Sequence, residues 1–275
     1  MKCAIVGLGL MGGSMGITLK ECGIFEEIAG FDKNQIHQIE AQKLSLVDKL
    51  IEFDEIKNYD VIILAIPVEA IISILQNLKD IKSDTTIIDL GSTKEQIVVK
   101  TPLEIRKNLV ASHPMTGTEK FGPTAAIKSL YENKVVVLCD LEDSGELQRD
   151  LAIYIFSKLK MRIQYMKAYE HDRHAAFISH LPHAISYALA NSVLSQEEPQ
   201  SILTLAAGGF KDMSRIAKSS PIMWSDIFKQ NKNFVIESIE IFENELKKAK
   251  CMIKDENYEE LEEWMKKAAT LHNIL

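Results

Sequence analysis

The sequence has few cysteines, and they form no recognisable pattern. Cys3, Cys22, Cys139 and Cys251 lie far apart, with no CxxC pair and no Cys/His spacing typical of a zinc site. We therefore expect reduced thiols and no bound metal. The sequence also lacks an uncharged run long enough to span a bilayer, and glycines interrupt its apolar opening, so no signal peptide is expected. These absences predict a cytoplasmic protein that does not bind a membrane.

Positive charge is scarce as well. The chain has 32 Lys and Arg residues against 39 Asp and Glu residues, which gives a net charge of -7 at pH 7. A broad cationic surface that binds a phosphate backbone is therefore not expected, and nucleic acid is not predicted as a partner. A small anionic substrate is compatible with this balance, because one or two cations in a pocket are enough to bind it.

The order of apolar segments predicts two domains. Short β-branched runs alternate with helical stretches in the first part of the chain, which is typical of a mainly parallel sheet flanked by helices. The expected strands are Cys3 to Val6, Glu27 to Phe31, Val61 to Ile66, Thr85 to Asp89, Leu109 to Ala111, Val135 to Leu138 and Arg162 to Tyr165. The expected later helices are Phe177 to Leu194, with a kink or break at Pro182, Pro221 to Lys250, and Tyr258 to Leu271. We therefore expect an α/β domain over residues 1–165 and an all-α domain over residues 166–275.

A glycine-rich turn follows the first expected strand and leads into a helix. Its residues are Gly7, Leu8, Gly9, Leu10, Met11 and Gly12. In a strand-turn-helix unit, the first glycine permits the tight turn, the second lets the backbone approach a pyrophosphate, and the third allows close helix packing. Asp32 ends the second strand about 20 residues further on, where a carboxylate binds the adenosine ribose hydroxyls. A 2′-phosphate would meet this carboxylate as a like charge, so NAD is favoured over NADP despite the adjacent Lys33.

Two further strand ends are expected at the same edge of the sheet. Ala65 and Pro67 follow one strand, and Ser92 follows another that ends at Asp89. Because ligands of parallel sheets bind at the carboxyl ends of strands, these three residues are expected to contact the cofactor. Pro67 suits a helix start equally well.

Several polar segments resemble the motifs of a known family. They are DLGSTK (residues 89–94), SHPMTGTE (112–119), FISHLPH (177–183), GGFKDMSRIA (208–217) and PIMW (221–224). In this order, and after GLGLMGGS (7–14), they resemble the prephenate dehydrogenases from Met1 to about Phe228. The resemblance implies a Rossmann-type NAD-binding domain followed by a helical substrate-binding and dimerisation domain. It also implies oxidative decarboxylation of prephenate, or of its transaminated counterpart arogenate, in tyrosine biosynthesis.

The resemblance assigns the reacting groups to three residues. His113 would bind the ring hydroxyl and take its proton as hydride leaves, which suits an imidazole with a pKa of about 6.5. Ser92 would share that hydroxyl, although it also suits a helix N-cap. Arg215 would bind a substrate carboxylate through its planar fork of donors, the alternative being a solvated helix cation.

Other substrate contacts follow from the same motifs. Ser179 and His183 lie four residues apart on one helical face, and a core histidine is the alternative for His183. Thr118 and Gly208 complete the substrate contacts within the chain. Trp224 would reach the active site of a neighbouring subunit, which implies a homodimer formed by the helical domain.

An ionic gate is the last feature that the resemblance implies. Glu119 and Asp172 would pair with Arg215 and open or close the site as ligands bind. Two unrelated surface carboxylates are the alternative.

Two other functions fit parts of the sequence. The β-hydroxyacid dehydrogenases also begin with GLGxMG and carry a helical second domain, but they rely on a helix-borne lysine and lack SHPMTGTE and SHLPH. An inert NAD-binding sensor is the other alternative, and intact His113, Ser92 and Arg215 argue against it. The choice between prephenate and arogenate stays open, because one local contact is enough to switch the preference.

Overall fold

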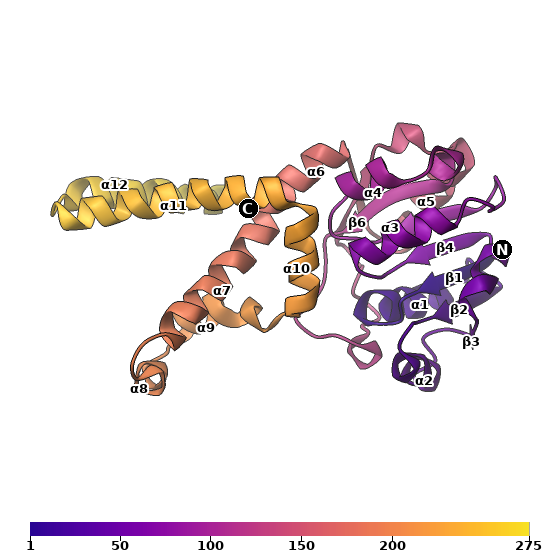
Figure 1. The fold of residues 1–275 in the computed structure, drawn as a ribbon, viewed down its shortest axis with the longest axis horizontal. Coiled ribbons are helices and arrows are strands. Elements are labelled where there is room, and N and C mark those ends of the chain that lie inside the picture. The colour runs from indigo at the N-terminus through magenta and orange to yellow at the C-terminus, as the bar shows by residue number, and fades with distance from the viewer. Residues whose placement is uncertain (275) are drawn as a thin grey trace.

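A single twisted sheet occupies the first part of the chain (Figure 1). The computed structural model describes residues 1–274. Its sheet has eight strands in the order β3-β2-β1-β4-β5-β6-β7-β8. The strands are β1 (Lys2–Val6), β2 (Glu27–Phe31), β3 (Lys49–Leu50), β4 (Val61–Leu64), β5 (Thr86–Asp89), β6 (Leu109–Pro114), β7 (Val135–Cys139) and β8 (Arg162–Met166). Neighbouring strands pair in parallel except β6 and β7, so the mainly parallel sheet is confirmed.

Alternate residues of the central strands face two separate layers of helices. In β1, Cys3 and Ile5 belong to the core that includes residues of α1 (Leu10–Cys22) and α5 (Glu146–Lys158). Ala4 and Val6 belong to the opposite core, which includes residues of α3 (Val68–Asn77) and α4 (Glu95–Lys100). Because successive side chains of a strand point to opposite faces, a strand that is apolar throughout requires helices on both sides. The helix α2 (Gln35–Lys43) adds Ala41 to the first core.

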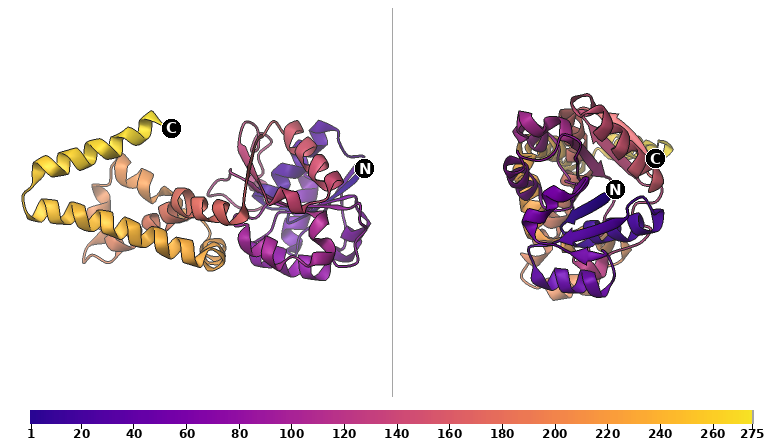
Figure 2. Two further views of the ribbon diagram at one scale, coloured as in Figure 1. Left: turned by 90° about the horizontal axis from the view of Figure 1, so that it is seen from above. Right: turned by 90° about the vertical axis from the view of Figure 1, so that its right-hand side faces the viewer.

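The chain after β8 is built from helices. They are α6 (Ala168–Ala175), α7 (Leu181–Leu194), α8 (Pro199–Thr204), α9 (Gly208–Ser214), α10 (Pro221–Gln230), α11 (Lys232–Lys254) and α12 (Tyr258–Ala269). Figures 1 and 2 show that they extend to one side of the sheet, with α11 and α12 forming a hairpin at the far end. This confirms the expected order of an α/β part and a helical part. Within residues 1–274, none of the helices combines the length and apolar character needed to cross a bilayer.

Two interruptions shape the helical part. The chain forms a π-helical turn over Ala176–His180 directly before α7, and Pro182 lies in the first turn of α7, so the helix changes its hydrogen-bonding pattern just before Pro182 and does not break there. The single helix expected over residues 221–250 is wrong, because the chain turns at Asn231 between α10 and α11. There the Asn231 side chain donates to the carbonyl oxygen of Asp172 at 2.7 Å, a tertiary contact that helical periodicity does not reveal.

An ion pair is buried where β5 leads into α4. Lys94 Nζ donates to a carboxylate oxygen of Asp89 and to the carbonyl oxygen of Ser112 at 2.6 Å, and both charged side chains are 0% exposed. Burial raises the pKa of Asp89, and the charge of Lys94 opposes this shift. The pair joins the ends of β5 and β6. Ser92 follows β5, and His113 lies near the end of β6.

Replacing the buried lysine tests how strongly this pair holds the strand ends. We expect Lys94→Met to lower the free energy of unfolding by about 3–5 kcal/mol, because it leaves the Asp89 carboxylate buried without a counter-charge. Urea unfolding measures this difference. The matched control is Lys100→Met on the exposed side of α4, where the change should stay within about 0.5 kcal/mol. Equal stability of the two variants would contradict the assigned role of the pair.

Candidate functional site

The glycine-rich turn has the geometry of a phosphate cradle. Gly7 has a φ of 92°, and a Cβ there would lie 2.4 Å from the carbonyl oxygen of Ala65. A Cβ at Gly12 would lie 1.8 Å from the carbonyl oxygen of Gly7, so neither position accepts a side chain. Gly9, at the N-cap of α1, faces open space instead, with Gly122 N the nearest atom at 4.0 Å from its Cβ position. A pyrophosphate therefore fits against the backbone at Gly9 and the start of α1.

Asp32 lies directly after β2 and is hydrogen-bonded to the glycine-rich turn. Its Oδ2 accepts from the backbone N–H of Leu8 at 2.8 Å, and its Oδ1 accepts from that of Asn34 at 2.8 Å. The side chain is 13% exposed, so the carboxylate still reaches the surface of the cradle. Leu10 and Met11 form the first turn of α1. The carboxylate is suited to ribose hydroxyls, which donate hydrogen bonds, and unsuited to a phosphate.

The ends of β4 and β5 flank the turn. Ala65 continues the pairing of β4 with β1, since its N–H donates to the carbonyl oxygen of Val6 at 2.8 Å. Pro67 takes the N-cap position of α3, and half-buried Ser92 follows β5. The sheet order β1-β4-β5 brings these residues to one edge with the glycines. The structure thus gathers the residues expected around a cofactor, and it also gives Pro67 the alternative role of starting a helix.

His113 is the first member of a hydrogen-bonded chain that crosses from the sheet to the helices. Its Nδ1 lies 2.8 Å from Nε2 of His171 on α6, and Nδ1 of His171 lies 2.8 Å from Oδ1 of Asp172. Asp172 in turn accepts from the backbone N–H groups of Lys94 at 2.7 Å and Glu95 at 2.9 Å. Sequence reasoning missed His171 as a site residue. The only signal was a His-Asp pair shortly after the last strand.

The surroundings of His113 favour its neutral form. Desolvation by the enclosing protein is the main cause that lowers the pKa of His113 well below 6.5, and electrostatic interactions with His171, Lys94 and His180 act in the same direction. Part of its surface stays accessible to solvent, and its Nδ1 is engaged with His171. The remaining ring nitrogen, Nε2, is therefore the atom available to accept a proton.

Arg215 contacts one of the two carboxylates expected to pair with it. Its Nη1 lies 3.5 Å from Oε2 of Glu119, and the two side chains are 58% and 34% exposed. An exposed pair of this kind contributes little stability and can exchange for a bound anion. Asp172 departs from the expectation, because it is 1% exposed and its oxygens bind His171 and the start of α4. Packing of α6 against the sheet directs this carboxylate inward.

His183 and Trp224 form a stacked pair. Their ring centroids lie 3.5 Å apart with an interplanar angle of 21°. His183 Nδ1 donates to the carbonyl oxygen of Ser179 at 2.9 Å, which leaves Nε2 as an acceptor. Burial lowers the pKa of His183, and the positive charge of Arg215 also lowers it. Trp224 is 6% exposed within its own chain, and its expected contribution to the site of a neighbouring subunit stays a prediction. The indole packs on α7 because α10 folds back beside that helix.

Thr118 and Gly208 lie at the surface on the segments that carry the Glu119–Arg215 pair. The hydroxyl of Thr118 accepts from the backbone N–H of Lys120 at 3.2 Å. Gly208 begins α9, and a Cβ there would meet no atom within 4 Å. Both positions are open to an approaching ligand.

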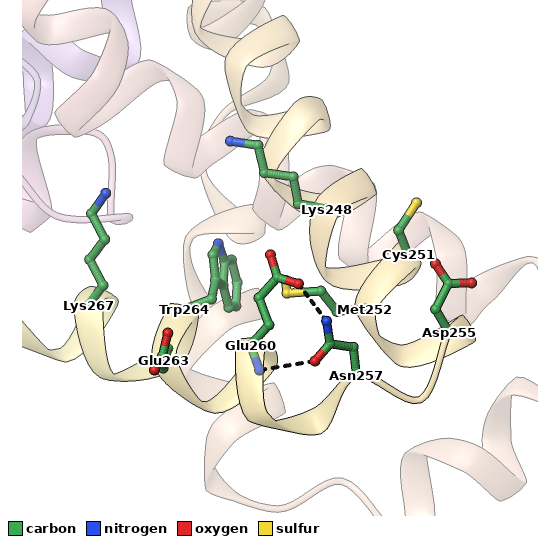
Figure 3. A pocket seen from close by; sticks show the side chains of 9 residues that line it. All are labelled: Lys248, Cys251, Met252, Asp255, Asn257, Glu260, Glu263, Trp264 and Lys267. Carbon is green, nitrogen blue, oxygen red and sulfur yellow. Dashed lines mark hydrogen bonds between the residues drawn. The ribbon is translucent and has the colours of Figure 1, made fainter.

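A cavity of about 540 Å³ lies apart from these residues, between α11 and α12 (Figure 3). It is lined by Lys248, Cys251, Met252, Asp255, Asn257, Glu260, Glu263, Trp264 and Lys267. Asn257 Nδ2 donates to Glu260 Oε2 at 2.6 Å, and the N–H of Glu260 returns a bond of 3.3 Å to Asn257, which caps α12. None of the residues expected to act in catalysis lines this cavity, so it is not assigned to the chemical site.

Two family models match the chain. The model described as "Prephenate dehydrogenase, nucleotide-binding domain" matches residues 15–165. The model described as "Prephenate dehydrogenase, dimerization domain" matches residues 167–267. The two matches together cover the sheet from β2 onward and most of the helical part, whereas β1 and the glycine-rich turn lie before the first match.

Relatives are similar to this chain along most of its length. A prephenate dehydrogenase of Lactococcus lactis is 33% identical over 258 residues, which are 89% of this chain and 69% of the relative. A cyclohexadienyl dehydrogenase of Zymomonas mobilis is 32% identical over 273 residues, which are 96% of this chain and 92% of the relative. The crystal structure of A. aeolicus prephenate dehydrogenase with hydroxyphenyl propionate and NAD+ has a TM-score of 0.93 at 33% identity, covering 99% of this chain and 97% of that one. On these matches, the chain belongs to the prephenate dehydrogenase family.

Proposed function

We propose that this protein catalyses the oxidative decarboxylation of prephenate to 4-hydroxyphenylpyruvate and CO2, with hydride transfer to NAD, in tyrosine biosynthesis. The observation that carries the proposal is the position of His113 at the sheet edge that also carries the glycine cradle, with Nδ1 bonded to His171 and with burial lowering the pKa of the ring, so that Nε2 can accept a proton. The similar A. aeolicus enzyme was crystallised with NAD+ and a hydroxyphenyl acid, which is the combination that this site would hold.

The reaction requires a hydride acceptor, a proton acceptor and groups that bind anions. NAD, held by residues 7–12 and Asp32, supplies the hydride acceptor when it is bound. As hydride leaves the hydroxyl-bearing ring carbon, Nε2 of His113 takes the hydroxyl proton. The resulting ketone character allows the bond to the ring carboxylate to break, CO2 leaves, and the ring becomes aromatic. The phenolate oxygen then takes the proton back from His113, and such acid-base assistance contributes about 10²- to 10⁴-fold in rate.

Binding of the substrate falls to residues on both parts of the chain. Arg215 would exchange Glu119 for a substrate carboxylate, so that Glu119 alone acts as the gate. Ser92 would orient the ring hydroxyl beside His113. Further contacts would come from Ser179, His183, Thr118, Gly208 and Trp224. In this role Trp224 acts from within its own chain, through its stack on His183.

The proposal extends to the organisation of the protein. Residues 1–165 would bind NAD, and residues 166–275 would bind substrate and form a homodimer. Support comes from the dimerization-domain match and from apolar side chains on α11 and α12 that are about half exposed. These side chains are Ile241, Leu246, Ile253 and Met265. A cytoplasmic location is proposed because the four cysteines are free thiols.

The direct test of the reaction is NADH formation from purified protein with prephenate or arogenate, each with NAD and with NADP. We expect turnover with prephenate and NAD, and a loss of about 10²-fold or more in kcat for His113→Asn. The control is His174→Asn, an exposed histidine on α6, which should retain wild-type kcat. Turnover with arogenate alone would make arogenate, and not prephenate, the substrate. No turnover with either compound would overturn the proposed reaction.

The acid side of the pH profile tests the state of His113. Because enclosure by protein and nearby positive charges lower its pKa, the imidazole stays neutral at pH 7 and becomes protonated only well below pH 6.5. Protonation removes the proton acceptor, so kcat/KM for prephenate should be level near neutral pH and fall only below pH 6.5. Initial rates between about pH 5 and pH 9 give this profile. An apparent pKa at or above 7 for the acid limb would argue against His113 as the base.

Removal of the guanidinium tests the assigned carboxylate site. We expect Arg215→Gln to raise the KM for prephenate by about 10-fold or more, because a hydrogen bond to a charged group contributes about 1.5–3 kcal/mol. The variant should change kcat much less, as expected for binding shared by ground and transition states. Lys218→Gln, in the same short helical turn, is the charge-matched control. Similar KM values for both variants would place the carboxylate elsewhere.

A further inference from the structure

We propose that His171 and Asp172 are positioning residues that keep a single proton on Nδ1 of His113 and so direct the Nε2 lone pair toward the substrate. The inference deepens the proposed function and rests on it for the role of His113. His171 and Asp172 would act only through His113, without touching the substrate.

The first step concerns the direction of the bond between Asp172 and His171. Oδ1 of Asp172 accepts from the N–H of Lys94 at 2.7 Å, and Oδ2 accepts from that of Glu95 at 2.9 Å. Backbone N–H groups only donate, so both oxygens already face donors. Oδ1 is therefore an acceptor toward Nδ1 of His171 as well, at 2.8 Å. His171 must carry its proton on Nδ1.

The second step carries this direction to His113. A neutral imidazole with a proton on Nδ1 has a lone pair on Nε2. Nε2 of His171 lies 2.8 Å from Nδ1 of His113, so His113 Nδ1 is the donor of that bond. The proton of His113 is thereby placed on Nδ1, and Nε2 is left unprotonated. A carboxylate that orients a histidine also governs which nitrogen of that histidine is basic.

Burial favours this one placement of the protons on His113 and His171. His171 is 2% exposed and Asp172 is 1% exposed, so solvent does not compete for these bonds. Asn231 holds the same turn of α6 from the helical side, donating to the carbonyl oxygen of Asp172 at 2.7 Å. Its amide nitrogen also lies 3.0 Å from Nδ1 of His180. The orientation of His113 therefore depends on both parts of the chain.

The hydrogen bonds that link His113, His171 and Asp172 also support the proton transfer itself. When Nε2 of His113 takes the substrate proton, the imidazolium keeps its Nδ1–H bond to His171, and the carboxylate of Asp172 stabilises the new charge through that ring. The titratable groups that face His113 are His171, Lys94 and His180, and the positive charge of Lys94 opposes protonation of His113. The carboxylate of Asp172, which is linked to His113 through two hydrogen bonds and the ring of His171, favours the protonation of His113.

Nitrogen NMR of the wild-type protein tests the inference without turnover. With ¹⁵N-labelled histidine at neutral pH, we expect His113 and His171 each to show a protonated Nδ1 and an unprotonated Nε2. The His113→Asn and His171→Gln variants assign the resonances. A wild-type His113 with its proton on Nε2, or a His171 with a proton on Nε2, would overturn the inference.

Asp172→Asn reverses the donor direction and tests the consequence. With its oxygen accepting from the N–H of Glu95 and its Nδ2 in the place of the present Oδ1, the amide donates to His171, loses the bond from the N–H of Lys94 and moves the proton of each histidine to Nε2. We expect that tautomer change in the NMR spectrum and a loss in kcat of about 10²-fold or more, with little change in KM. Glu170→Gln, an exposed carboxylate on the same helix, is the matched control.

A conservative exchange at His171 separates positioning from mere filling of space. The amide oxygen of His171→Gln can replace Nε2 as the acceptor, so this variant should retain most of kcat, whereas His171→Leu should lose about 10²-fold. Wild-type kcat in His171→Leu or Asp172→Asn would overturn the inference while leaving the proposed reaction intact. If wild-type protein turns over neither substrate, the proposed reaction fails and the NMR result still decides the proton positions.

Discussion

The carboxylate of Asp172 is the contact on which the geometry of this site depends. This carboxylate is buried and accepts hydrogen bonds from two backbone N–H groups at the start of α4. It also binds His171, the histidine that contacts His113. A buried carboxylate is tolerated only when its lone pairs are satisfied, so the helical part of the chain can dock on the sheet in few ways. The positions of Ser92, before α4, and His113, on β6, follow from that docking.

Two buried carboxylates near His113, those of Asp89 and Asp172, have different effects. Asp89 is paired with Lys94, whose charge disfavours a second cation nearby, and this helps to keep His113 neutral. Within residues 1–274, the carboxylate of Asp172 binds two backbone N–H groups and His171 but no Lys or Arg side chain, so its charge remains available to the hydrogen-bonded histidines. The site thus combines a base that is neutral at rest with an anion that stabilises it once protonated.

Binding and chemistry occupy regions of different exposure. The chain from His113 to Asp172 leads into the interior, where side chains are held by several bonds each. Arg215 and Glu119 lie near the surface, where their weak pair can open without cost to the fold. His183 and Trp224 lie between these regions, since the indole stacks on His183 and lies edge-on to His180 at 6.0 Å. Such a gradient from exposed to buried groups suits an anionic substrate that enters past a gate.

Local spacing in the sequence determined the strands, the glycine cradle with Asp32, and the order of an α/β part and a helical part, because these depend on periods of two or 3.6 residues and on short turns. The motifs around His113, Ser92 and Arg215 were also recognisable in the sequence. Only the tertiary structure decided that β3 is a two-residue strand, that the chain breaks at Asn231, and that Trp224 packs within its own chain. It also decided that Asp172 faces inward, because His113 and His171 are 58 residues apart and meet only when α6 packs on the sheet. Hydrogen-bond partners so distant in sequence depend on how whole elements dock, which no local pattern of residues encodes.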